Sequence, residues 1–233
     1  MRKLLLAAIL LFSTAVLAED VVLTTQNTVI IRGAITGTSV TMAMLDIATQ
    51  VVRRGTQKYT IYLVLDSPGG SIVAGDAFIQ FAKTIPNLET VTIFSASMAA
   101  GIVEALPGRR LITENGIFMF HRASGKFEGQ FEDGEVESQL RLWKSIVRAM
   151  EIKNATRMGM GLQEYKDKIK DEYWLYGTEA VEKKGADAQV DIKCTPQLVK
   201  QRVKVYVESF FGSGEVQFSG CPLFRASLKK ENI

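Results

Sequence analysis

Two side chains of this sequence could together catalyse a reaction. His121, the only histidine of the chain, ends the stretch FMFH, and Ser97 lies among small side chains in FSASMAAG. A serine hydroxyl becomes a nucleophile when a neighbouring base with a pKa near neutrality takes its proton, and histidine is the ordinary base of this kind. Ser97 and His121 are therefore the candidate nucleophile and base. Each also has a plainer interpretation, because a lone histidine is more often structural and serines often cap helices.

A third stretch, LDSPGG at residues 65–70, interrupts an apolar run with a charge, a proline and two glycines. Glycine has no Cβ and adopts positive φ readily, so a Gly-Gly turn can direct a backbone N–H group at an oxyanion. A plain strand-to-helix turn is the simpler interpretation of these residues alone. A phosphate-binding loop is excluded, since the sequence has neither GxxxxGK[ST] nor GxGxxG.

The elements that must position these residues alternate between strand and helix. Apolar, β-branched stretches predict strands, and apolar residues at helical spacing predict helices between them. The predicted strands are 27–35, 58–66, 89–94 and 116–120, and the predicted helices are 39–55, 71–85 and 97–106. Such alternation indicates an α/β fold with a mostly parallel sheet, whose active site lies at the carboxyl ends of the strands. All three stretches directly follow predicted strands.

The second half of the sequence contains a longer helical pattern. Residues 135–152 predict one long amphipathic helix, packed either on its own domain or on a partner subunit. Its apolar residues recur at spacings of three and four: Val136, Leu140, Trp143, Val147 and Met150. Asn154-Ala155-Thr156 matches a glycosylation acceptor, although the end of a helix is the plainer interpretation. Residues 199–211 fit a helix or a strand, and both remain open.

The first eighteen residues have the pattern of a secretory signal peptide. Two basic residues precede an apolar run that ends in small residues before Glu19. We therefore expect a periplasmic or secreted protein, with no stable membrane span after cleavage. Cys194 and Cys221, the only cysteines, are then expected to form a disulfide. The formal net charge of +3 comes without a long basic run, which argues against a nucleic-acid partner. No persuasive metal site or cofactor motif is present.

Five motifs in order resemble the Clp protease proteolytic subunit over about residues 28–190. They are SPGGS at 67–71, ASMAA at 96–100, FMFH at 118–121, GKFEGQ at 125–130 and WLYGTEAVEKKG at 174–185. The resemblance implies an α/β fold of the Clp protease/crotonase type, built of repeated β-β-α units with a long "handle" helix. It divides the chain into a signal peptide (1–18), a serine peptidase domain (19–190) and a C-terminal extension (191–233).

The resemblance also implies roles for individual residues. Ser97 would be the nucleophile and His121 the base, and the backbone N–H groups of Gly70 and Met98 would form the oxyanion hole. Glu172 stands where the family has the acid of the triad, and its neighbour Asp171 is the alternative. The handle would join subunits into closed homo-oligomers that admit peptides or unfolded chains.

The sequence departs from the family at several positions. Ile93 stands where the family has a glycine, and Arg122 and Ala123 replace the usual Gln-Pro, so the substrate channel is expected to differ. Because an exported protein meets no ATP, we expect an ATP-independent endopeptidase without an ATPase partner.

Three other functions remain open at this stage. One is a catalytically inactive scaffold or partner subunit that keeps the fold. Another is a membrane-associated protease similar to signal peptide peptidases, which share the SPGG turn but use a lysine base and lack this histidine. A crotonase-type acyl-CoA enzyme shares the general fold but needs neither Ser97 nor export.

Overall fold

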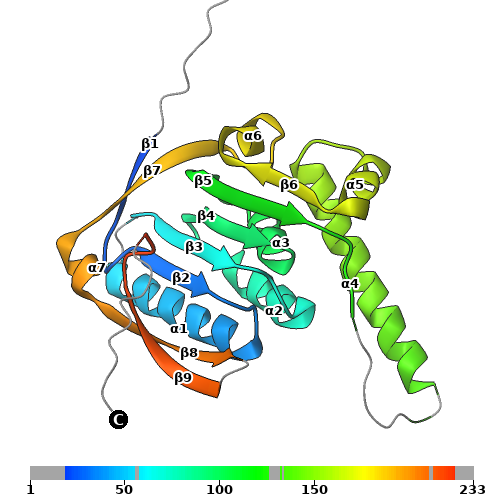
Figure 1. Ribbon diagram of the computed structural model, residues 1–233, viewed down its shortest axis with the longest axis horizontal. Coiled ribbons are helices and arrows are strands. Elements are labelled where there is room, and N and C mark those ends of the chain that lie inside the picture. The colour runs from blue at the N-terminus through cyan, green and yellow to red at the C-terminus, as the bar shows by residue number, and fades with distance from the viewer. Residues whose placement is uncertain (1–18, 56–57, 126–131, 133, 210–211, 224–233) are drawn as a thin grey trace, which may run out of the picture.

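A mostly parallel sheet forms the centre of the protein (Figure 1). The computed structural model describes residues 19–55, 58–125, 132, 134–209 and 212–223; the predicted signal peptide lies outside these residues. The seven strands of the sheet have the order β1-β7-β5-β4-β3-β2, and β6 pairs with β5 as the one antiparallel neighbour. The α/β fold with a mostly parallel sheet, predicted from the sequence, is confirmed.

The elements have the following bounds. The strands of the sheet are β1 (Glu19–Leu23), β2 (Thr28–Arg32), β3 (Ile61–Ser67), β4 (Leu88–Ala96), β5 (Arg110–Phe120), β6 (Tyr173–Tyr176) and β7 (Ala188–Cys194). The helices are α1 (Gly37–Arg54), α2 (Ile72–Ala82), α3 (Met98–Ala105), α4 (Glu135–Arg157), α5 (Leu162–Lys168), a 3-10 turn η1 (Ile169–Asp171), α6 (Gly177–Glu182) and α7 (Pro196–Lys200). Strands β8 (Arg202–Ser209) and β9 (Gly212–Ser219) form a separate hairpin.

Local signals explain where the first helices begin and end. The Thr36 hydroxyl accepts from the Ser39 N–H at 3.1 Å and the Ser39 hydroxyl accepts from the Thr36 N–H, which closes a capping box at the start of α1. The helix ends at Gly55, whose φ of 54° suits glycine. Ser71 caps α2 by accepting from the Ala74 N–H at 3.2 Å. These hydroxyls satisfy N–H groups that a helix start leaves free.

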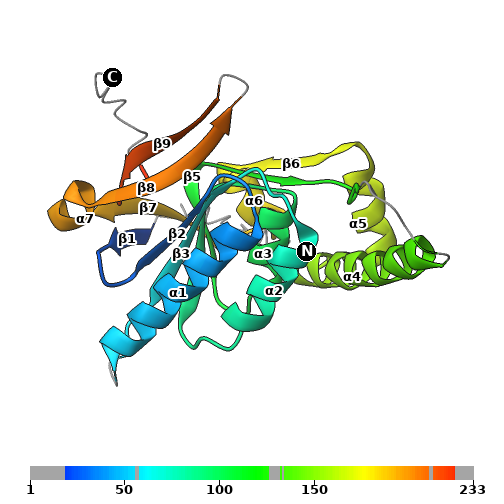
Figure 2. The same ribbon diagram turned by 90° about the horizontal axis from the view of Figure 1, so that it is seen from below.

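The two faces of the sheet are covered differently. Helices α1, α2 and α3 pack on one face, whereas α7 and the β8–β9 hairpin lie on the other (Figure 2). Alternate residues of β3 point into the two cores: Leu63 and Leu65 belong to the larger one, and Val64 to the smaller one. Burial on both faces explains why β3 reads as a continuous apolar run.

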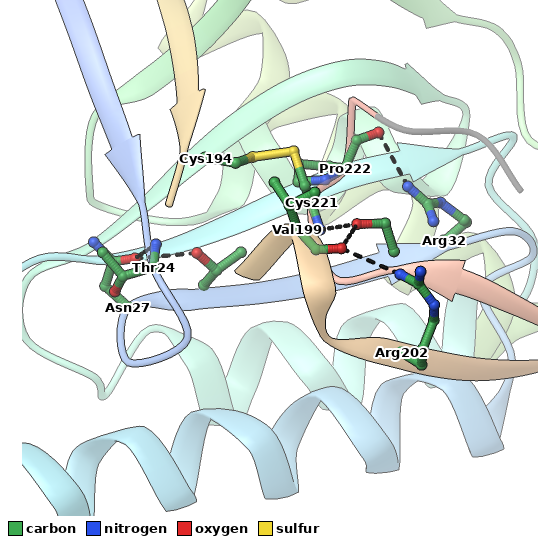
Figure 3. The surroundings of a disulfide bond; sticks show 10 residues. Thr24, Asn27, Arg32, Cys194, Val199, Arg202, Cys221 and Pro222 are labelled. Atoms are coloured by element: carbon green, nitrogen blue, oxygen red, sulfur yellow. Dashed lines mark hydrogen bonds between the residues drawn. A yellow bond between two sulfur atoms is a disulfide. The ribbon is translucent and has the colours of Figure 1, made fainter. Parts of the chain in front are cut away.

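The C-terminal extension is attached to the sheet by a disulfide and by Arg32 (Figure 3). Cys194 at the end of β7 is bonded to Cys221, with Cα atoms 5.9 Å apart, so the expected pairing is present in the structure. Arg32 donates to the Pro222 carbonyl at 3.1 Å and lies over the Phe218 ring at 4.7 Å. These contacts hold the end of the hairpin against β2 and β7.

The structure extends or changes several elements predicted from the sequence. Strand β5 begins at Arg110, before the predicted start, and α4 continues to Arg157. Of the two possibilities left open for the tail, the strand is the one formed, as β8. Most of α4 lies away from the body of the molecule in Figure 1, and only Asn154 and Ala155 of this helix are buried. Within the residues described, no helix has both the length and the apolar character needed to cross a membrane.

Candidate active site

Ser97 occupies a strained turn between β4 and α3. Its φ of 54° is uncommon for a residue other than glycine. Two backbone hydrogen bonds hold this conformation: the Ser97 N–H donates to the Met119 carbonyl at 2.8 Å, and the Gly101 N–H donates to the Ser97 carbonyl at 3.0 Å. The Ser97 side chain makes no capping bond to α3. The hydroxyl is therefore free for another partner, which weighs against the capping interpretation.

That partner is His121, which directly follows β5. Strands β4 and β5 are parallel neighbours, with Ala96 opposite Met119, so the two strands end side by side. His121 Nε2 and Ser97 Oγ lie 2.6 Å apart, and both residues are partly buried. This distance is short enough for a hydrogen bond in which the imidazole accepts the serine proton. The two residues singled out by their chemistry are thus brought together by neighbouring strands.

The Gly69-Gly70 turn lies against the start of α3. Gly69 and Gly70 have φ values of 91° and 145°. A Cβ added to Gly69 would lie 2.7 Å from the Ser97 Cβ and 2.8 Å from the Met98 nitrogen, and one added to Gly70 would lie 2.5 Å from the Ile35 carbonyl oxygen. These distances are far below normal contacts. Glycine is required here both for backbone conformation and for close approach.

Ile35 fixes the direction of this turn. Its N–H donates to the Gly69 carbonyl at 2.8 Å, and its carbonyl accepts from the Ser71 N–H at 2.8 Å. These bonds leave the intervening Gly70 N–H without a protein acceptor among the described residues, and the same holds for the N–H of Met98, the first residue of α3. A helix N-terminus carries partial positive charge. Two unpaired N–H groups beside the serine could stabilise an oxyanion.

The structure gives less evidence for the third residue of the expected triad, the acid that would bond to His121. In the antiparallel pairing of β5 and β6 the last pair is Phe120 and Tyr173, and His121 and Glu172 are the residues next to it along the chain. Glu172 lies outside β6 and has a φ of 66°. The Glu172 side chain is exposed and accepts a hydrogen bond from Trp174 Nε1 at 3.0 Å. Asp171 is also exposed. No hydrogen bond joins a carboxylate to His121 among the residues described, so the role of Glu172 stays a prediction.

A cavity of about 330 Å³ lies beside the Ser97–His121 pair. One wall comes from the sheet and α3, including Met98 and Met119, and the other comes from α4 and the segment after it. The second wall is formed by Val147, Met150, Glu151, Asn154, Tyr165 and Ile169. Asn154 and Tyr165 were not expected at the site from the sequence. The apolar stripe of α4 continues from Met150 to position 154, so a polar residue in that stripe was the available signal.

An ion cluster joins the last turn of α3 to the start of β5; its Glu104 and Arg110 side chains are buried, whereas the Asp187 side chain is 36% exposed. Glu104 of α3 contacts Arg110 at 2.6 Å, and Arg110 also contacts Asp187 at 2.6 Å. Burial raises the pKa of Glu104 to about 8, against the opposing effect of the Arg110 charge. Burial also acts on Asp187, but hydrogen bonds from Arg110 outweigh it and lower the pKa of this carboxyl. None of these three residues lines the cavity, so the cluster supports the packing of α3 on β5 and does not contact a bound substrate.

Comparison with known protein families agrees with this geometry. The family model described as Clp protease matches residues 19–187, which include every strand of the sheet except the last, β7. The matched region contains the Gly-Gly turn, Ser97 and His121. The C-terminal extension, with the disulfide and the hairpin, lies outside it. Since the match covers well over half of the sequence, this chain belongs to the Clp protease family.

Proposed function

We propose that this protein is an exported, ATP-independent serine endopeptidase that hydrolyses peptides or unfolded protein segments. The observation that carries the proposal is the 2.6 Å contact between His121 Nε2 and Ser97 Oγ, next to two unpaired backbone N–H groups. Membership of a peptidase family supports the same reaction class.

In the proposed mechanism His121 takes the Ser97 proton as Oγ attacks the carbonyl carbon of the scissile peptide bond. The carbonyl oxygen becomes an oxyanion, and the N–H groups of Gly70 and Met98 donate to it. His121 then gives the proton to the leaving amine, and water hydrolyses the acyl-enzyme by the same path in reverse. Glu172 is proposed to hold the imidazolium, which requires its carboxylate to turn from Trp174 toward His121.

Covalent labelling of the serine tests this proposal. A fluorophosphonate probe should label the wild-type protein and fail to label Ser97→Ala, while Ser95→Ala, whose hydroxyl contacts Thr92 in the buried core, keeps the label. Peptide hydrolysis by Ser97→Ala should fall by about 10⁶ in kcat, as when a serine protease loses its nucleophile. Absence of labelling in well-folded wild-type protein would favour the inactive scaffold instead.

Export and independence from ATP need their own tests. The proposed signal peptide requires the mature protein to begin at Glu19, which N-terminal sequencing of the protein from its native host can establish. Hydrolysis of peptides without ATP is expected, and a stable complex with a cytosolic ATP-driven unfoldase would contradict the proposal. Homo-oligomers, expected from the family resemblance, can be measured by sedimentation.

A further inference from the structure

A buried serine closes the Gly69-Gly70 turn from the side of β3. Ser67 is the last residue of this strand, and its exposed fraction is 0%. Its hydroxyl oxygen accepts a hydrogen bond from the Gly69 N–H at 3.1 Å. A serine that bonds the N–H two residues further along the chain forms a tight local turn. Ser67 therefore fixes the start of the turn that carries Gly70.

The Gly69 N–H depends on this hydroxyl. Gly69 is buried, whereas Pro68 and Gly70 on either side of it are exposed, so water reaches the flanking residues more easily than the Gly69 N–H. Within the part of the chain that the structure describes, Ser67 Oγ is the one acceptor of this N–H. A buried N–H group without an acceptor is unfavourable. Removal of the hydroxyl would therefore favour a different conformation of the turn.

Two successive glycines oppose such a change only weakly. Because glycine has no Cβ, hydrogen bonds rather than steric contacts determine how the peptide groups next to Gly69 are oriented. The peptide group that contains the Gly69 N–H is held by Ser67, and the next one is held by Ile35, whose N–H donates to the Gly69 carbonyl at 2.8 Å. In a trans peptide the N–H points away from the carbonyl. The Gly70 N–H thus points away from Ile35, and Gly70 lines the candidate-site cavity.

We propose that Ser67 is a positioning residue for the oxyanion hole: its hydroxyl fixes the turn in the orientation that directs the Gly70 N–H into the cavity. Ser67 acts through the backbone and does not line the cavity itself. Its bond also determines which glycine donates to the oxyanion, because it occupies the Gly69 N–H and leaves that of Gly70 free. The inference rests on the proposed peptidase function, since an oxyanion forms only if Ser97 attacks a carbonyl.

Steady-state kinetics of Ser67→Ala on an internally quenched peptide tests this role. The value of kcat should fall by about 10- to 100-fold, because a small displacement of a group that acts in the transition state is costly. KM should stay within about twofold, since the oxyanion exists only after the attack. The rate of fluorophosphonate labelling should fall by a similar factor. In that reaction Ser97 Oγ bonds to phosphorus, His121 takes its proton, fluoride leaves, and negative charge develops on the phosphoryl oxygen.

Two further variants separate positioning from packing. Ser67→Thr keeps a hydroxyl on the same carbon and should retain most of the wild-type kcat. Ser95→Ala is the matched control, because Ser95 lies opposite Ser67 on β4, is equally buried, and has its hydroxyl against Thr92 instead of the turn. Each alanine variant loses a buried hydroxyl, so both should lower the midpoint of urea unfolding by similar amounts. Only Ser67→Ala should lower kcat.

The possible failures are distinguishable. A folded Ser67→Ala variant with the same kcat as Ser95→Ala would overturn the role of Ser67 and leave the peptidase function standing. A change in KM alone, or an equal loss of kcat in folded Ser67→Thr, would do the same. If Ser67→Ala does not fold, Ser67→Cys decides, because a thiol is similar in size but a weaker acceptor. Its kcat should fall, and an unchanged kcat would overturn the role. Absence of labelling and hydrolysis in the wild type would overturn the function and the inference together.

Discussion

At the scale of single residues, the site is built from backbone conformations that most side chains avoid. Ser97 has positive φ without being glycine, and two hydrogen bonds, to Met119 and from Gly101, hold it there. Strain of this kind costs of order 1–3 kcal/mol and persists where the surroundings determine the conformation. Here it directs Oγ away from the start of α3 and toward His121. The folded state is therefore less stable by this amount at Ser97, the proposed nucleophile.

The Gly69-Gly70 turn allows two effects of a Cβ to be separated: the strain of a positive φ and the steric clash with Ser97 and Met98. Gly69→Ala should lower kcat for peptide hydrolysis by at least about 10²-fold. The new Cβ would lie 2.7 Å from the Ser97 Cβ and 2.8 Å from the Met98 nitrogen, so it would displace both groups. Gly33→Ala is the matched control, since Gly33 also has positive φ, at 80°, but a Cβ there meets nothing within 4 Å. It should lower only the free energy of unfolding, by about 1 kcal/mol. Equal activity in the two variants would refute a special role for the Gly69 contact.

The identity of the acid is also a question about single residues. Glu172 directly precedes Tyr173, the β6 partner of Phe120, whereas Asp171 is one residue further from this pair. Glu172→Gln should therefore reduce kcat by roughly 10²–10⁴, because it removes the charge that stabilises the imidazolium. Asp171→Asn should change kcat much less. Steady-state kinetics on one peptide decides between them, and a larger loss in Asp171→Asn would assign the role to that residue.

Residue types alone led to the Ser97–His121 pair, but the cavity beside them was not predictable in the same way. A single histidine at a strand end and a serine among small residues stand out in any sequence. Asn154 and Tyr165 do not, because they lie on different helices and their pairing depends on how α4 and α5 pack. That no carboxylate of the described residues bonds to His121 was likewise unpredictable, since the Glu172 contact depends on the rotamer of an exposed side chain.

At the scale of elements, the sequence predicts best where one periodicity dominates. The apolar run of β3 and the long stripe of α4 were both predicted, and the latter ends only five residues later than expected. Strand β5 was only half predicted, because its first residues, RLITEN, mix charges with apolar side chains. Helix α1 was predicted at residues 39–55, yet two of the apolar residues within that range, Met42 and Leu45, are 56% and 57% exposed. Periodicity locates a helix more reliably than it identifies the buried face.

The Glu104 cluster predicts how the packing of these elements depends on pH. An unfolded glutamate titrates near 4.5, whereas burial raises the pKa of Glu104 to about 8. Between these values the native state holds a proton that the unfolded chain has lost, so the free energy of unfolding should fall as pH rises from about 4.5 to about 8. Glu104→Gln removes this titration and should flatten the decline, by on the order of a few kcal/mol over the window.

Urea unfolding at several pH values measures this effect. Glu19→Gln is the control: its hydrogen bond with Arg109 lowers the pKa of that exposed carboxyl, so its contribution is lost only as pH falls below about 4.5. The decline between pH 5 and pH 8 should thus be the same in Glu19→Gln as in the wild type. Burial also raises the pKa of Asp46 and of Glu89, so a smaller decline should remain in Glu104→Gln. A decline as steep as that of the wild type would mean that Glu104 is ionised in the native state.

At the scale of the whole molecule, the candidate site and the C-terminal extension lie on opposite faces of the sheet. The Ser97–His121 pair and the cavity lie on the side of α3, α4 and α5, whereas the C-terminal extension covers part of the other face. Leu198 and Cys221 of the extension pack against Val64, Val91 and Leu111 of the sheet. This second core is small, and only the part that the extension contributes to it lies outside the region that matches the family. The disulfide compensates for the small apolar area by fixing the end of the extension.

Removing the disulfide should therefore affect stability and leave the chemistry intact. Cys194 and Cys221 are separated by 27 residues, and a loop of this size stabilises the folded state by about 3 kcal/mol in the chain-entropy model. The double variant Cys194→Ala/Cys221→Ala should lose about this much free energy of unfolding in urea, and reductant should lower the wild type similarly. Fluorophosphonate labelling of Ser97 should continue in both under native conditions, because no residue of the extension lines the cavity. Loss of labelling in the folded double variant would show that the second face of the sheet supports the active site.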